Sequence, residues 1–154
     1  MQPPQHGQGP RQKPLLALAL LAYGVILAFI VFWPRPVDRN LSGELSRLLD
    51  LLHSAGVPAW INYELVEFAA NVVLFLPAGL LLAAWLSPRW AWLAAVAGVC
   101  CSAAIETGQA LLIAGRYGTA QDVIANGLGA ALGTVMVYLW RAGASRRAEP
   151  APSP

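Results

Sequence analysis

The chain is poor in charged residues: Asp, Glu, Lys and Arg together make up only 12% of its 154 residues. Soluble domains carry about 25% charged residues, so this composition argues against a water-exposed globular fold. The net charge of +2 is too small, and the basic residues are too scattered, for a nucleic-acid-binding surface. The rest of the sequence is 57% hydrophobic with a mean hydropathy of +0.55, which is typical of a membrane protein.

Residues that bind metals or form disulfides are scarce as well. The two cysteines are neighbours, Cys100 and Cys101, and this spacing matches neither a zinc site nor a disulfide framework. We expect both to be small buried packing residues of an apolar helix. The two histidines, His6 and His53, are far apart, which excludes a metal site built on histidine. No cofactor signature is present, so we expect neither a metal nor a cofactor.

Long uncharged runs are what the sequence has instead. About 20 apolar residues are enough for a helix to cross the hydrocarbon core of a membrane. The sequence predicts an all-α polytopic membrane protein, a bundle of four transmembrane helices over residues 15–33, 65–86, 90–114 and 120–140. The membrane domain would cover residues 14–141. The segments on either side, 1–13 and 142–154, have compositions that predict disorder.

Basic residues divide unequally between the two predicted faces of the membrane. On the face with the termini they are Arg11, Lys13, Arg89, Arg141, Arg146 and Arg147. On the opposite face they are Arg35, Arg39, Arg47 and Arg116. Because cytoplasmic loops are usually richer in Lys and Arg, we expect a multi-pass inner-membrane protein with both termini in the cytoplasm.

The loop between the first two spans carries a helical pattern of its own. Leucines recur at helical spacing opposite charged residues, and Gly56 can end the helix. These leucines are Leu41, Leu45, Leu48, Leu49 and Leu52. The pattern predicts an amphipathic outer-loop helix, for which two interpretations are open. The helix lies on the membrane surface in one, and it forms a lid over the outer mouth of the bundle in the other.

A few polar side chains interrupt the apolar segments, as pairs at helical spacing. The pairs are Glu67 with Asn71, Glu106 with Gln109, and Asp122 with Asn126. Members of a pair share one helix face. The alternation of the spans brings all three pairs to the end of the bundle that holds the amphipathic loop. Arg116, in the link before the last span, is the one cation near them and can bridge carboxylates with bidentate bonds.

Ionisable residues inside a membrane span cost roughly 2.5–3.5 kcal/mol, so they usually have a partner and a function. We therefore expect a site at this end of the bundle. The predicted ligand-binding residues are Asn71, Gln109, Arg116, Asn126 and Glu67. The predicted acid–base residues are Glu106 and Asp122. The alternative is a structural network of polar bonds that holds the helices together.

Small residues and a proline point to helix packing. Gly129 and Gly133 form a GxxxG pattern, which lets two helices approach closely. Pro77 and Gly79 interrupt the middle of the second span, where proline removes a backbone hydrogen bond and predicts a bend.

Taken together, these residues resemble the VanZ-like family of small bacterial membrane proteins over about residues 60–140. The matching segments are EFAANVVLFLPAG at 67–79, ETGQ at 106–109, GR at 115–116 and DVIANGLGAALG at 122–133. The resemblance implies that the characteristic positions are Asn71, Phe75, Pro77, Gly79, Glu106, Gln109, Arg116, Asp122 and Asn126. Gln121 departs from the pattern, because many members carry a second acidic residue there, and Thr119 stands where Asp or Ser is frequent.

The family takes its name from a member linked to low-level resistance to teicoplanin, a glycopeptide that binds cell-wall precursors. The resemblance implies a role in the cell envelope, at the outer membrane face near lipid-linked precursors. Three functions are consistent with these residues and with the resemblance. The polar pocket binds an envelope component such as a lipid head group or a glycopeptide. Alternatively, the protein is a membrane hydrolase or transferase with Glu106 as general acid or base, or a structural or partner-binding subunit.

Overall fold

Within the described residues the chain folds into five α-helices, and four of them are long and apolar enough to cross a membrane. The structure, a computed structural model, describes residues 12–32, 38–112 and 119–147. The four long helices are α1 (Gln12–Val31), α3 (Tyr63–Trp85), α4 (Leu93–Leu112) and α5 (Ala120–Arg147). The shorter elements are α2 (Asp38–Ser54) and a 3-10 turn, η1 (Pro88–Trp90). The predicted all-α bundle with four apolar spans is confirmed.

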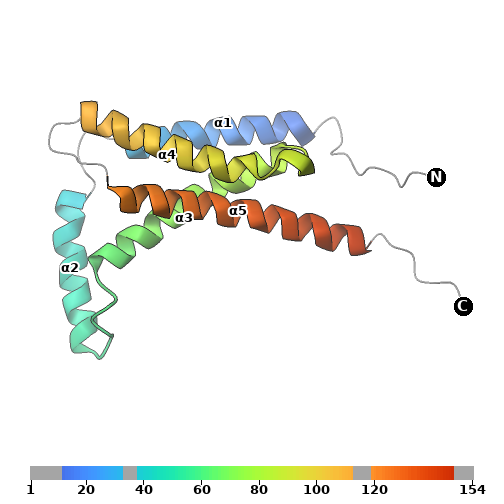
Figure 1. Cartoon of the computed structure of the whole chain (residues 1–154). Helices are drawn as coiled ribbons and strands as arrows, with labels where there is room; N and C mark the ends of the chain where they lie inside the picture. The colour runs from blue at the N-terminus through green and yellow to red at the C-terminus, as the bar shows by residue number, and fades with distance from the viewer. Residues whose placement is uncertain (1–11, 33–37, 113–118, 148–154) are drawn as a thin grey trace, which may run out of the picture.

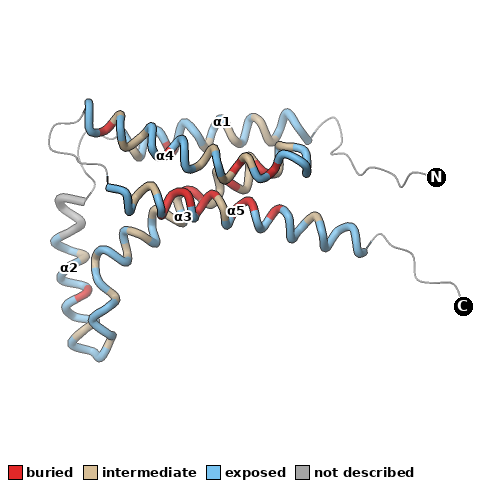
Figure 2. The backbone as a smooth tube through the Cα atoms, in the orientation of Figure 1, coloured by how far each residue is buried: buried red, intermediate tan, exposed pale blue. Residues whose placement is uncertain are grey.

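Helices α3 and α5 form the centre of the bundle, because they pack on each other, α4 packs on both of them and α1 packs on α3. The long helices alternate in direction, so α1 begins and α5 ends at the same end of the bundle (Figure 1). We call this the terminal end and call the opposite end, where α2 lies, the α2 end. Buried residues concentrate in the middle of α3 and α5 (Figure 2). The outward faces of the spans are apolar and exposed, as contact with lipid requires.

The closest approach of two helices is between α3 and α5. A Cβ on Gly129 would overlap the carbonyl oxygen of Val72, and a Cβ on Gly133 would overlap that of Leu76. On α3, a Cβ on Gly79 would likewise overlap the backbone of α5. Glycines at these positions let the two backbones touch, and this close packing supplies the attraction that holds helices together in lipid.

Pro77 lies inside α3 and removes one backbone donor from it, yet the helix continues on both sides. The Tyr23 hydroxyl on α1 donates to the carbonyl oxygen of Leu74 at 2.6 Å, just before the proline. The carbonyl that loses its helical partner to Pro77 is that of Val73, so the Tyr23 hydroxyl adds a donor from a neighbouring helix at the adjacent carbonyl. Phe75 is fully enclosed and packs beside Gly129, so this stretch of α3 faces α5.

The last helix is longer than the sequence predicts. It continues to Arg147 rather than ending at residue 140, so residues 142–147 are helical where we predicted a disordered tail. Arg146 and Arg147 stand in its last turn, where cations stabilise a helix through its dipole. Residues 148–154 lie outside the described residues.

The starts of α1 and α4 also differ from the prediction. Helix α1 begins at Gln12, inside the segment 1–13 that we predicted to be disordered. Pro14 falls in its first turn, where the missing N–H has no helical partner to lose. Helix α4 begins at Leu93, later than predicted, because Pro88 starts the separate turn η1.

Cys100 and Cys101 are both exposed on α4, so the prediction that they are buried is wrong. Helix α4 buries the face that holds Ser102 against α5. Successive residues of a helix point about 100° apart, since there are 3.6 residues per turn, and the two cysteines fall outside that face.

The predicted amphipathic helix is present as α2, and it lies across the end of the bundle (Figure 1). Gly56, with φ of 97°, follows it in the left-handed region that glycine adopts most readily. Leu49 is buried, whereas Leu48 and Leu52 are exposed. Exposed leucines on such a helix suit the membrane surface, while the lid interpretation remains a prediction.

Candidate functional site

The polar cluster begins at the first turn of α5. Thr119 precedes the helix, and its Oγ1 accepts a hydrogen bond from the backbone N–H of Asp122 at 3.2 Å, as an N-cap does. The same hydroxyl donates to Oδ2 of Asp122 at 2.8 Å. Asn71 on α3 donates from Nδ2 to Oδ1 of Asp122, also at 2.8 Å. Both oxygens of this carboxylate are therefore engaged, one in the helix cap and one across the α3–α5 interface.

Asn126 lies one turn further along α5 and is only 5% exposed. Its Nδ2 donates to Oγ of Ser102 on α4 at 2.8 Å, and Ser102 is completely buried. The Oδ1 atom of Asn126 is buried and has no hydrogen-bond partner among the described residues. A buried polar atom without a partner costs about 1–3 kcal/mol, and within the described polar cluster this oxygen is the fully buried side-chain atom that has none.

Gln109 on α4 connects to α1 rather than to the other predicted site residues. The side chain is 4% exposed, and its Nε2 donates to the carbonyl oxygen of Val31 at 2.8 Å. Val31 is the last residue of α1, and the last carbonyls of a helix have no partner within it. Gln109 therefore caps the end of α1.

The structure brings together only part of the predicted set by direct bonds. Asn71 and Asp122 are bonded to each other, whereas Gln109 and Asn126 bond to Val31 and Ser102 instead. Glu67 is exposed near the start of α3, and Glu106 is half-buried one turn before Gln109. Arg116 lies outside the described residues.

Ser102 belongs to the cluster although it is not among the predicted site residues. A signal for it existed, because Ser102 precedes Glu106 by four positions, and residues four apart share a helix face. Thr119 was predicted only as a departure from the family pattern. In the structure its hydroxyl makes two hydrogen bonds to Asp122.

The polar cluster consists of amide, hydroxyl and carboxylate groups bonded to one another and to helix ends. Amide and hydroxyl groups from α4 and α5 face each other inside a bundle of low dielectric constant, where hydrogen bonds are stronger than in water. Among the described residues, no group of three or more His, Cys, Asp or Glu is placed to hold a metal ion.

A family model described as VanZ/LLP1 matches residues 20–141, which is most of the chain. The chain belongs to the VanZ-like family. The match begins within α1, so the VanZ-like region includes the first span and is longer than the 60–140 over which the motifs are recognisable. No curated protein and no solved structure matches the chain significantly.

The terminal end of this VanZ-like bundle is held together by Arg141 on α5. Its Nη2 donates to the carbonyl oxygens of Ala83 and Ala84 at 3.1 Å and of Leu86 at 2.9 Å. These carbonyls end α3, so the guanidinium caps that helix and complements its dipole. The sequence predicted Arg141 only as a marker of orientation.

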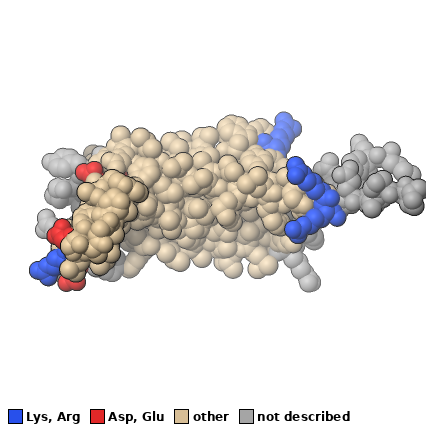
Figure 3. All heavy atoms as spheres, turned by 90° about the horizontal axis from the view of Figure 1, so that it is seen from below, with Lys and Arg blue, Asp and Glu red and all other residues tan. Residues whose placement is uncertain are grey.

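Charge separates along the axis of the VanZ-like bundle. Figure 3 shows basic side chains at the terminal end, and acidic side chains with one basic group at the α2 end. The described basic side chains at the terminal end are Lys13, Arg89, Arg141, Arg146 and Arg147. The described acidic residues all belong to α2, to the first turns of α3 and α5 or to the last two turns of α4.

Proposed function

We propose that this VanZ-like membrane protein binds a component of the cell envelope through the polar cluster at the α2 end of its bundle. The observation that carries the proposal is the buried Oδ1 of Asn126, which has no partner among the described residues. In a low-dielectric interior such an acceptor favours a ligand that brings an O–H or N–H donor. Sugar hydroxyls and peptide amides supply these donors, and a lipid-linked cell-wall precursor or a glycopeptide carries both.

The other polar residues of the cluster have supporting roles in this proposal. Asp122, Asn71 and Gln109 hold the helices in place, because each is engaged in a bond between helices or at a helix end. Arg116 is the predicted partner for an anionic group of the ligand. With Asp122 given a structural role, the alternative of a membrane hydrolase or transferase rests on Glu106 alone.

The Asn126→Leu variant tests the proposal. Leucine has the branched shape of asparagine and removes the unpaired acceptor, but it also removes the donor that bonds to the buried Ser102 hydroxyl. These two effects on stability oppose each other, so we expect the thermal midpoint without ligand to change by less than about 3 °C. The probes are teicoplanin and a purified lipid-linked cell-wall precursor, each added to the detergent-solubilised protein. At a concentration of 100 Kd a ligand stabilises by about 2.7 kcal/mol, so we expect the wild-type midpoint to rise by about 5 °C or more with at least one probe. The variant should show no rise.

Thr134→Val is the matched control, since Thr134 is also buried on α5 and its hydroxyl bonds only to its own helix. This variant should keep the wild-type response to the probes. A wild type that responds to neither probe contradicts the proposal. A large loss of stability in Asn126→Leu, with Thr134→Val unaffected, also contradicts it and supports a purely structural network.

We further propose that the protein lies in the inner membrane with its terminal end in the cytoplasm, so that the polar cluster faces outward. The basic side chains of the terminal end support this orientation. A fluorescent protein fused after Pro154 should fold and emit light in cells. A cysteine at position 54, in place of Ser54 at the end of α2, should react with a membrane-impermeant maleimide in intact spheroplasts. The opposite pair of results would reverse the orientation.

A further inference from the structure

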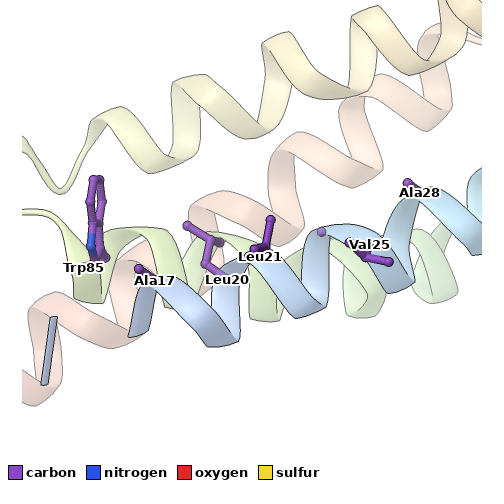
Figure 4. A pocket seen from close by; sticks show the side chains of 7 residues that line it. Ala17, Leu20, Leu21, Val25, Ala28 and Trp85 are labelled. Atoms are coloured by element: carbon purple, nitrogen blue, oxygen red, sulfur yellow. The ribbon is translucent and has the colours of Figure 1, made fainter. Parts of the chain in front are cut away.

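An apolar groove runs along the outside of α1, away from the polar cluster. Its volume is about 440 Å³, and it is lined by residues of α1 from Ala17 to Ala28 and by Trp85, the last residue of α3. Figure 4 shows Trp85 and Ala17 at one end of this groove, with Leu20 and Leu21 further along α1. A Cβ built on Gly24, in the middle of the lining, meets no atom within 4 Å, so the floor of the groove is open there.

The length of the groove fits one lipid chain. From Ala17 to Ala28 the helix rises about 16 Å, at 1.5 Å per residue. The hydrocarbon core of a bilayer is about 30 Å thick, so a single leaflet supplies acyl chains of about this length. The wall is built from three larger aliphatic side chains, three small residues and one indole, which together suit a hydrocarbon chain.

Positive charge surrounds the end of the groove that holds Ala17 and Trp85. Lys13 precedes Ala17 by four positions on α1 and therefore lies on the same helix face, one turn closer to the membrane surface. Arg89 follows Trp85 in the turn η1, and its guanidinium lies 5.1 Å from the ring centre of Trp90. Described acidic residues are confined to the opposite half of the bundle. A negatively charged head group is the complement of this end.

We propose that the groove binds an anionic phospholipid, with one acyl chain along α1 between Ala17 and Ala28 and the phosphate beside Lys13 and Arg89. The lipid belongs to the leaflet at the terminal end. Trp85, at the level where chain and head group meet, has the amphipathic ring that membrane proteins place at this depth. Arg141 holds the backbone beside Trp85 in place, since it bonds to the carbonyls of Ala84 and Leu86, the residues on either side of Trp85.

Native mass spectrometry of the full chain, released from mixed vesicles of phosphatidylglycerol and phosphatidylcholine, tests this site. We expect wild type to retain phosphatidylglycerol about 5-fold to 30-fold more than phosphatidylcholine, because each surface cation contributes about a factor of five. Gly24→Leu should reduce the retained lipid of both kinds at least about 5-fold, since its Cβ starts in open space and the rest of the side chain occupies the groove. Gly143→Leu is the matched control, because a Cβ there also meets open space but lies far from the groove.

A second set of variants tests the role of charge independently of the Gly24→Leu variant, which tests the groove. Lys13→Gln combined with Arg89→Gln should bring the ratio of the two lipids to within about twofold of one, while total retained lipid stays measurable. Equal retention by wild type and Gly24→Leu overturns the proposal. An unchanged lipid ratio in the double variant overturns it as well. Dimers that disappear in Gly24→Leu, without bound lipid in wild type, would assign the groove to a second copy of the chain instead.

Discussion

Replacing Gly133 with leucine is expected to remove most of the folded protein. The new side chain would start where the carbonyl oxygen of Leu76 and the amide nitrogen of Leu80 already lie. Both are backbone atoms of α3, so no side-chain rotation can make room. Overpacking of a close contact costs typically 1–3 kcal/mol, and here a helix must move, so we expect a loss of more than about 3 kcal/mol. The yield of monodisperse protein in size-exclusion chromatography measures the effect.

The control for this variant is Gly143→Leu, which places the same side chain on the same helix in open space. It should elute and melt like wild type. If Gly133→Leu gave the same yield and thermal midpoint as Gly143→Leu, then α3 and α5 would not approach each other as closely as the structure shows.

Asp122→Ala should lower the free energy of unfolding by about 2–3 kcal/mol. The substitution removes the acceptor of two side-chain bonds, from Asn71 across the helix interface and from Thr119 in the cap. Hydrogen bonds to charged groups contribute about 1.5–3 kcal/mol each in soluble proteins, and bonds between membrane helices are weaker, about 0.6 kcal/mol on average. Unfolding in mixed micelles with increasing SDS measures the difference.

A double-mutant cycle isolates the bond that joins α3 to α5. Asp122→Ala and Asn71→Ala should show a coupling energy of about 1 kcal/mol, whereas Gln121→Ala, at the exposed neighbouring position, should be additive with Asn71→Ala. If Asp122→Ala kept full stability but abolished the response to teicoplanin or the lipid-linked precursor, the carboxylate would belong to the ligand site. The structural role that we give to Asp122 would then be wrong.

The architecture was predictable because the sequence patterns that indicate it extend over whole segments of the chain. Four apolar runs of sufficient length, and a leucine pattern of helical period in the first loop, are properties of whole segments and survive small errors. Helix ends were less predictable, as α5 shows: the residues after Trp140 include Gly143 and several alanines, which looked like a tail. The backbone hydrogen bonds of α5 nevertheless continue to Arg147, where Arg146 and Arg147 in the last turn stabilise the helix through its dipole.

The site was only partly predictable because many of its partners are not side chains of the predicted set. The approximate position of the polar residues followed from alternation of the spans, and the bond between Asn71 and Asp122 agrees with it. Gln109, in contrast, bonds to a backbone carbonyl 78 positions away. Every residue has a carbonyl, so no pattern in the sequence marks Val31 as an acceptor. The same applies to the carbonyls that Arg141 caps.

The cap that Gln109 places on α1 has a consequence for how the protein is made. The first span enters the membrane during synthesis, long before α4 has left the ribosome. Until then the carbonyl of Val31 has no side chain from α4 to bond with, and it must be satisfied by water or by lipid head groups at the surface. Likewise, the Tyr23 hydroxyl can donate its hydrogen bond to the carbonyl oxygen of Leu74 only after α3 has been made. The bonds of α1 are thus completed only after α3 and α4, which follow it in the chain, have been made. Newly made chains that lack α4 should therefore be good substrates for membrane proteases.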